Sequence, residues 1–207
     1  MNRLELVNRL ISEAGVTNLV LGTTVNQRGE ALQFVNWIDD AWQEVAGLHN
    51  WPSLWEQAQI TVMAGQSTRA QSVAHPRYEK DTGFIGTTLL EYLPWADFRK
   101  TYPVVRSGNP AVWTIRPDRS LALNAIVEAD TVVSVERYKA PARFLADADA
   151  PGLFEEHHMM IVWRGLMFYG GFDEASVAYK RGASEYALMK RLAAGDLPTM
   201  ELGEPLL

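Results

Sequence analysis

The fold is decided by residues 154–194, which read FEEHHMMIVWRGLMFYGGFDEASVAYKRGASEYALMKRLAA. The first half carries apolar residues on nearly every side of a helix, a pattern typical of a helix buried in a core. These residues are Met159, Ile161, Val162, Trp163, Leu166, Met167 and Phe168. We therefore predict a buried helix that opens near Phe154 and breaks at Tyr169-Gly170-Gly171-Phe172.

The second half of the stretch predicts a partner helix. It begins after Asp173, a favourable N-cap, with Glu174 in its first turn. Its apolar stripe repeats at helical spacing and consists of Ala175, Ala178, Gly182, Tyr186, Met189 and Ala193. Small residues in the stripe allow a neighbouring backbone to approach, either inside the subunit or from another copy. Ala175, Ala178 and Gly182 are therefore candidates for helix packing or a subunit interface.

Two amphipathic helices precede this pair. The first is expected over residues 2–14 and ends at Gly15, a natural C-terminal stop. The second opens at Asn26 or Gln27 and extends to about Leu48, before Pro52 ends the segment. Its inward face is predicted to hold Ala31, Phe34, Val35, Ile38, Trp42 and Val45.

The segment between these helix pairs has β character. Alternating residues predict strands over Trp55–Met63 and Thr131–Tyr138, and Pro117-Asp118-Arg119 predicts the turn of a hairpin from Ala111 to Leu123. Residues 67–88 show no period and are predicted to be a long loop or ragged hairpin, and a short helix is expected over Trp95–Lys100. The strands are expected to form one small antiparallel sheet.

This order predicts an α+β, mainly α fold. We expect a four-helix bundle with a small antiparallel β insertion between its second and third helices, and an extended C-terminal tail. Residues 1–52 and 150–196 would form the helical domain, and 53–149 the β-rich insertion. Residues 197–207 have no period, two prolines and several apolar residues, and are expected to dock on a partner. The docking candidates are Leu197, Pro198, Met200, Leu202, Pro205, Leu206 and Leu207.

Composition excludes several classes. Hydrophobic residues are 47% and charged residues 21% of the 207, so a disordered chain is not expected. The net charge of −6 argues against a protein that coats DNA, which needs a basic face. The absence of cysteine excludes disulfides and Cys-ligated zinc. Neither a signal peptide nor a run of about 20 apolar residues is present, so we expect a soluble chain that is not exported by a standard route.

The sequence predicts no catalytic, cofactor or metal site. Glu155 and His158 share a helix face and could hold a metal. Separately, the acidic cluster of Asp147, Asp149, Glu155 and Glu156 could run acid/base chemistry or hold Mg²⁺. However, H-E-x-x-H, G-x-S-x-G and phosphate-loop motifs are all missing, so a solvated acidic turn is the expected reading. A small carboxylate- or metal-dependent enzyme is the alternative hypothesis.

Basic residues and tryptophans leave two further interpretations open. The basic groups are Arg99-Lys100, Arg137-Lys139-Arg143, Lys180-Arg181 and Lys190-Arg191. Acids separate them, so we expect solvated surface rather than a nucleic-acid patch; a cytoplasmic scaffold or DNA-binding regulator remains an alternative. Trp42 and Trp163 lie on apolar helix faces and are predicted core residues. Trp37, Trp95 and Trp113 are either satellite core residues or interface anchors.

The order of motifs resembles one family of proteins. It comprises L-x-x-x-L-I-S-E-A-G (Leu6–Gly15), V-N-W-I-D-D-A-W (Val35–Trp42), W-T-I-R-P-D-R-S-L-A-L-N (Trp113–Asn124), V-E-R-Y-K-A-P (Val135–Pro141), and a D-x-D-x-P linker before E-x-H (Glu155–His157). In this order the chain resembles the head-to-tail adaptor, or connector, proteins of tailed bacteriophages from Leu6 to Ala194.

The resemblance implies a structural protein without a cofactor. Such adaptors form a ring, commonly of twelve copies, beneath the portal, extend the DNA channel and support downstream tail or nozzle proteins. Their C-terminal tails often clasp the portal. The implied partners are therefore the portal, further copies of the chain and tail proteins, with DNA passing through without sequence-specific binding and no membrane contact. The implied location is the head–tail interface of the virion, after assembly in the host cytoplasm.

Overall fold

The computed structural model describes residues 1–70 and 77–196. The chain divides into two compact units, each with its own core. Unit 1 combines Met1–Leu54 with the chain from Pro141 onward, and unit 2 is Trp55–Ala140.

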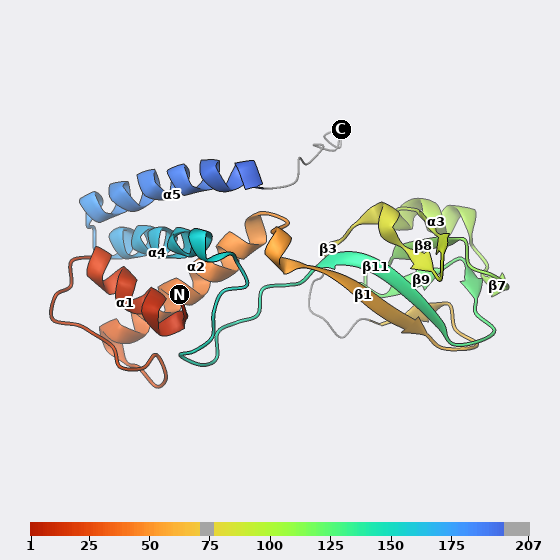
Figure 1. Cartoon of the computed structure of the whole chain (residues 1–207), viewed down its shortest axis with the longest axis horizontal. Helices are drawn as coiled ribbons and strands as arrows, with labels where there is room; N and C mark the ends of the chain where they lie inside the picture. Colours follow the sequence, from red (N-terminus) through yellow and green to blue (C-terminus); the bar gives the residue numbers. More distant parts are fainter. Residues whose placement is uncertain (71–76, 197–207) are drawn as a thin grey trace. The chain divides into compact units, whose positions relative to one another are not determined.

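Unit 1 is helical (Figure 1). Its helices are α1 (Arg3–Glu13), α2 (Gly29–Leu48), α4 (His158–Phe172) and α5 (Ser176–Asp196), with short 3-10 helices at Pro52–Leu54 and Glu155–His157. A capping box starts α1: the Asn2 side chain accepts from the backbone N–H of Glu5, and the Glu5 carboxylate accepts from the N–H of Asn2. This exchange satisfies two of the N–H groups that a helix start leaves without partners.

The helix α4 occupies the middle layer of unit 1. On one face, a Cβ atom added at Gly165 would lie 3.0 Å from Leu10 of α1 and 3.5 Å from Ile38 of α2. Gly170, roughly 140° further around the helix axis, lies instead against the backbone of Tyr179 in α5. Helices α1 and α2 therefore cover one face of α4 and α5 covers the opposite face, as Figure 1 shows.

The predicted burial of α4 is confirmed. Met160, Ile161, Val162 and Leu166 have no exposed surface, because other helices cover two opposite faces of α4. The predicted break at Gly170-Gly171 is wrong. Both glycines lie within α4, which continues to Phe172, and the chain turns over residues 173–175, where Glu174 has φ +51°.

Unit 2 is built around a long antiparallel pair. The strands β1 (Trp55–Val62) and β11 (Thr131–Tyr138) pair over their full length, from Trp55 opposite Tyr138 to Val62 opposite Thr131. The short strands β3 (Arg77–Tyr78) and β4 (Phe84–Ile85) also pair with β11, and β5 (Thr88–Leu89) extends the sheet from β4.

A second sheet has the strand order β2-β9-β8-β6, and a third consists of the parallel pair β10-β7. Their bounds are β2 (Thr68–Arg69), β6 (Glu91–Tyr92), β7 (Arg106–Ser107), β8 (Val112–Ile115), β9 (Leu121–Leu123) and β10 (Ala125–Ile126). The predicted hairpin appears as β8 and β9, and the predicted short helix as α3 (Trp95–Thr101). The core of unit 2 centres on Trp113, Leu121, Leu123, Val133 and Val135, none of which is exposed.

The predicted fold class is wrong. The described residues form five α-helices and three sheets, rather than a four-helix bundle with one small sheet. One helix, α3, lies in unit 2. The described part of 67–88, predicted to be a long loop or ragged hairpin, contains the two-residue strands β2, β3 and β4 and the first residue of β5. Strands this short show no detectable alternation. Their pairing depends on partners distant in sequence, so the local pattern did not reveal them.

Candidate interaction surface

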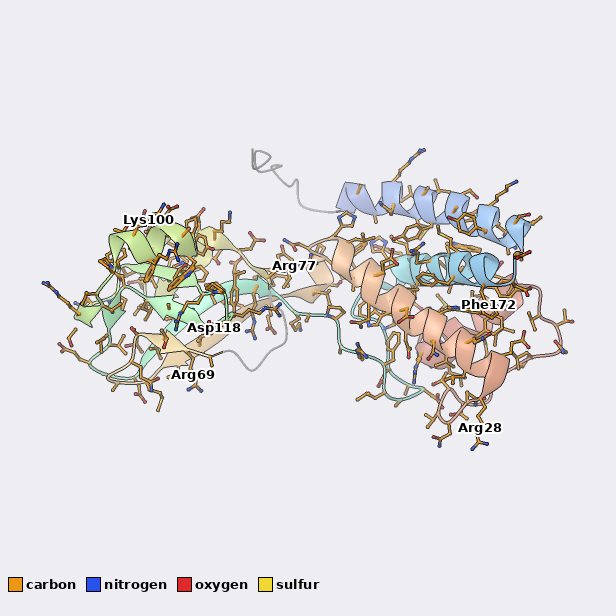
Figure 2. The ribbon with its side chains drawn as sticks, turned by 180° about the vertical axis from the view of Figure 1, so that it is seen from behind. Arg28, Arg69, Arg77, Lys100, Asp118 and Phe172 are labelled. Atoms are coloured by element: carbon orange, nitrogen blue, oxygen red, sulfur yellow. The ribbon has the colours of Figure 1, made fainter. Side chains whose placement is uncertain are left out.

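The outer face of α5 exposes large apolar side chains. Val177 is 80% exposed, Leu192 61% and Leu188 50%. Exposed basic residues, Lys180 and Arg191, lie between them along the same side of the helix. In Figure 2 a row of α5 side chains points away from α4. We call these five residues the α5 outer face.

The opposite side of α5 carries the predicted stripe of small residues. Gly182 is buried: a Cβ atom there would lie 2.9 Å from the carbonyl oxygen of Trp163 and 3.1 Å from the Met167 side chain. Ala178 is partly buried against the unit 1 core, and Ala175 is partly buried in the turn before α5. The small residues therefore permit close contact between α5 and α4 within one subunit.

A buried carboxylate ties α5 to the first helix. Glu13 of α1 has a side chain only 9% exposed, and its Oε2 lies 2.6 Å from Nη2 of Arg181. Its other oxygen lies 2.7 Å from Nη2 of Arg9. The guanidinium of Arg181 also lies 5.3 Å from the ring centroid of Trp163, within cation–π range. Arg181 thus helps to hold α5 on unit 1 through Glu13 and Trp163. These contacts do not involve the residues of the α5 outer face.

The helix α2 presents an acidic surface on the other side of unit 1. Its sequence contains four acids and no base. Two acids are engaged internally: Asp39 with Arg3, and Glu44 with Arg164, whose Nη2 lies 2.9 Å from Oε2. Burial raises the pKa of Asp39, and the hydrogen bond and charge of Arg3 oppose that rise.

The remaining acids of α2, Glu30 and Asp40, are exposed and make no ion pair with the described residues. Leu32 and Leu48 of the same helix are each 40% exposed. Glu30, Asn36, Asp40 and Leu48 lie within about 120° of one another around the helix, and we call these four residues the α2 outer face.

A pocket of about 280 Å³ lies between α3 and the strands β2 and β9 of unit 2. Trp95 and Phe98 stack with ring centroids 5.9 Å apart, and the guanidinium of Arg116 lies 5.4 Å from the Trp95 centroid. Trp95, a predicted interface or packing residue, is thus half-buried at this pocket. Trp113 is fully buried in the unit 2 core. The docking candidates from Leu197 to Leu207 lie outside the described residues.

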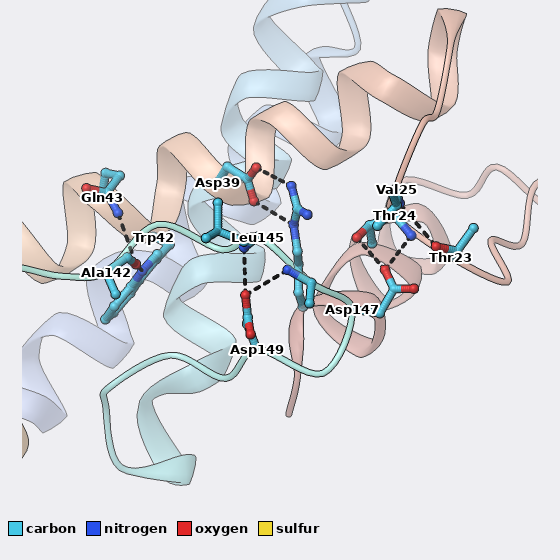
Figure 3. Close-up of polar contacts among 12 residues, drawn as sticks. Thr23, Thr24, Val25, Asp39, Trp42, Gln43, Ala142, Leu145, Asp147 and Asp149 are labelled. Atoms are coloured by element: carbon cyan, nitrogen blue, oxygen red, sulfur yellow. Dashed lines mark hydrogen bonds and ion pairs between the residues drawn. The ribbon is translucent and has the colours of Figure 1, made fainter.

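The acids of the 141–153 segment shape its path (Figure 3). Asp147 accepts hydrogen bonds from the backbone N–H and hydroxyl of Thr24, at 2.6 and 2.5 Å. Asp149 accepts from the N–H groups of Leu145 and Ala146, at 2.6 and 2.8 Å. Hydrogen bonds from Thr23 and Thr24 lower the pKa of Asp147, and those from Ala146 and Leu145 lower the pKa of Asp149. Asp147 thus ties the segment to the loop between α1 and α2, and Asp149 closes a turn within the segment.

Both ring nitrogens of His158, which the sequence paired with Glu155 as possible metal ligands, contact other groups. Nε2 of His158 lies 3.0 Å from the carbonyl oxygen of Leu153, and Nδ1 lies 2.8 Å from the amino group of Met1. The carbonyl can only accept, so Nε2 carries the hydrogen and Nδ1 accepts from the ammonium group. The Glu155 side chain is 85% exposed. Across residues 1–70 and 77–196, no three His, Asp or Glu side chains gather as a metal site.

The predicted basic groups are distributed over both units, and some of their members are paired with acids. Arg137 donates to Glu56 at 2.7 Å, and Arg181 is paired with Glu13. Lys100 lies on α3 of unit 2, as Figure 2 shows, whereas Lys180 and Arg191 lie on α5. In the described part of the chain, no helix is long and apolar enough to cross a membrane.

Sequence reasoning missed the α5 outer face. Its signal was available as a second set of apolar residues, Val177, Leu188 and Leu192, on the side of the helix opposite the small stripe. A helix in a single subunit needs only one apolar side, so a second one indicates a further contact.

Comparison with known proteins identifies the family. No match to a curated protein was found. The family model described as SU10 adaptor protein matches residues 1–202 of the 207, and so spans both units. This chain therefore belongs to the SU10 adaptor family, a phage head–tail adaptor family of structural proteins.

Proposed function

We propose that copies of this chain form a ring that joins the phage portal to the tail and extends the DNA channel. The family membership supports the adaptor role, and the resemblance of the motifs to connector proteins supports a ring of twelve copies. The ring would act at the head–tail interface of the virion after assembly in the host cytoplasm. Its neighbours would be the portal on one side and tail or nozzle proteins on the other.

The observation that carries the proposal is the α5 outer face. Val177, Leu188 and Leu192 are half or more exposed along one side of a 21-residue helix. Apolar side chains gathered on one face mark contact sites, because association removes them from water. In a ring, each copy could bury this face against its neighbour.

The charge of the chain supports passage of DNA without tight binding. Its 25 acids outnumber its 19 basic residues, and the basic groups are dispersed or paired internally. A channel that strongly attracted phosphates would hold DNA rather than let it pass. We propose a channel that DNA traverses without sequence-specific contacts.

Imaging with the portal tests the proposal. Purified chain mixed with the portal of the same virus is expected to form rings on the portal in negative-stain images. Leu188→Glu with Leu192→Glu should prevent ring formation, because both charges would be placed on the α5 outer face. Val20→Glu is the matched control, because Val20 is 82% exposed but lies outside α5. Absence of rings with the unaltered chain would contradict the proposal.

The C-terminal segment is proposed to bind the portal. Residues 197–207 combine five large apolar residues with two prolines, a composition suited to extended docking. Deleting 197–207 should weaken assembly on the portal and leave the melting temperature of the isolated chain unchanged. Calorimetry and a portal-binding assay measure the two effects. A large fall in melting temperature would show instead that the segment belongs to the fold.

A further inference from the structure

We infer that neighbouring copies meet head to tail: the α5 outer face of one copy docks on the α2 outer face of the next. This inference rests on the proposed ring and assigns the two surfaces that build it. Both surfaces belong to unit 1.

The two faces lie on opposite sides of the unit. The α4 layer separates them, with Gly165 against Leu10 and Ile38 on one side and Gly170 against Tyr179 on the other. A contact between different surfaces on opposite sides leaves both surfaces available on the next copy. Repetition of such a heterologous contact generates a closed ring when the rotation between copies closes.

The charges of the two faces are complementary. The helix α5 contains four basic and two acidic residues, whereas α2 contains four acids and no base. Lys180 and Arg191 on α5, like Glu30 and Asp40 on α2, are exposed and have no ion-pair partner among the described residues. Pairing α5 with α5, or α2 with α2, would instead oppose like charges. Charge pattern therefore favours the α5–α2 contact over either self-contact.

The faces also match in length and apolar character. With 21 and 20 residues, α5 and α2 are each about 30 Å long at 1.5 Å per residue. Leu48 of α2 is 40% exposed and offers apolar surface to Val177, Leu188 and Leu192. An interface with apolar contacts and a charged surround is the usual composition of a subunit contact.

Cysteine cross-linking tests the contact directly, because the chain has no native cysteine. Asn36→Cys places a thiol near the middle of α2, and Ser184→Cys places one near the middle of α5; both residues are exposed. Central positions cross-link whether the two helices meet parallel or antiparallel. Rings formed on the portal from an equal mixture of the two single variants are oxidised and analysed by non-reducing gel.

The expected product is a mixed Asn36→Cys/Ser184→Cys dimer, and the double variant should give a ladder of higher oligomers. Val20→Cys, at an 82% exposed residue between α1 and α2, is the control and should not cross-link to either variant. If rings form without the mixed dimer, or with only self-linked Ser184→Cys, the assigned contact is wrong. The proposed ring function would not be contradicted by that result. Absence of rings on the portal would overturn the proposed function and the inference together.

A charge exchange provides an independent test. Lys180→Glu with Arg191→Glu should weaken ring assembly at least tenfold, because the α5 face would then repel α2. Adding Glu30→Lys and Asp40→Lys to the same chain should restore assembly, since the contact regains opposite charges. Arg106→Glu, on an exposed residue of unit 2, should have no effect. Failure of the fourfold variant to recover, with helical content unchanged by circular dichroism, would contradict the assigned contact.

Discussion

Two adjacent glycines, Gly170 and Gly171, differ in whether their surroundings leave space for a side chain. A Cβ atom at Gly170 would lie 2.5 Å from the backbone nitrogen of Tyr179, whereas one at Gly171 would meet nothing within 4 Å. Both lie in the last turns of α4. Gly170 is therefore required for the close approach of α5, and Gly171 is not.

Alanine at these positions should have opposite effects on the free energy of unfolding. Gly170→Ala should lower it by about 1–3 kcal/mol, because backbone atoms must move to remove the clash. Gly171→Ala should raise it by up to about 1 kcal/mol, since alanine favours the helix. Urea unfolding measures both, and the second variant is the matched control for the first. Equal effects would show that α4 and α5 are not in close contact at Gly170.

His158 predicts a pH dependence of stability. Burial lowers its pKa, and the nearby Met1 ammonium and His157 act in the same direction, while Glu155 and the Leu153 carbonyl oppose them. The native state thus keeps the imidazole neutral at a pH where the unfolded chain, with a pKa of about 6.5, binds a proton. The stability that the neutral imidazole contributes is fully present above the pKa of the unfolded chain. It is lost as the pH falls through the lower pKa that His158 has in the folded chain.

The free energy of unfolding should therefore fall between about pH 7 and the lower native pKa of His158. In His158→Gln this part of the pH dependence should disappear, because glutamine does not titrate. Urea unfolding at a series of pH values measures the difference between the two proteins. Parallel pH profiles would mean that His158 is not kept neutral by burial.

At the scale of the element, the Asn2 side chain caps and stabilises the N-terminus of α1. Asn2→Ala removes the side-chain acceptor for the Glu5 N–H and should lower the free energy of unfolding by about 1 kcal/mol. Ser12→Ala, an exposed change in the last turn of the same helix, is the control and should have little effect. Thermal or urea unfolding distinguishes them, and a similar loss in both variants would argue against the capping box.

Local sequence predicted the long helices and strands but not the two-residue strands. The helix α2 appears where its period placed it, with Phe34, Ile38 and Trp42 buried, because one amphipathic face is a local property. The strands β1 and β11 were also visible as alternation. The two-residue strands were not, because each is defined by hydrogen bonds to a distant partner, such as Val133 opposite Ile85.

At the scale of the whole molecule, each unit has its own hydrophobic core, so we predict that a core substitution destabilises only the unit that contains it. Leu10 lies in the unit 1 core and Leu121 in the unit 2 core, and both are fully buried. Leu121→Ala should destabilise unit 2 by about 2–5 kcal/mol, because a cavity remains where the side chain was. Hydrogen exchange should then accelerate in Trp55–Ala140 and remain unchanged in α1, α2 and α4.

Leu10→Ala is the reciprocal variant and should accelerate exchange in the helices of unit 1 alone. Mass spectrometry of peptic fragments assigns the change to each unit. Acceleration of both units by either substitution would show that they unfold as one cooperative body.

The sequence by itself determined the buried character of α4, the amphipathic faces of α1 and α2, and the motif order that resembles the adaptor family, because periodicity and motif order are properties of the linear chain. It also contained the small stripe of α5, but not which surface that stripe meets. Only the tertiary structure placed Gly182 against Trp163 inside the subunit. It also left Val177, Leu188 and Leu192 on the outside, since which side of a helix is covered depends on packing against other elements.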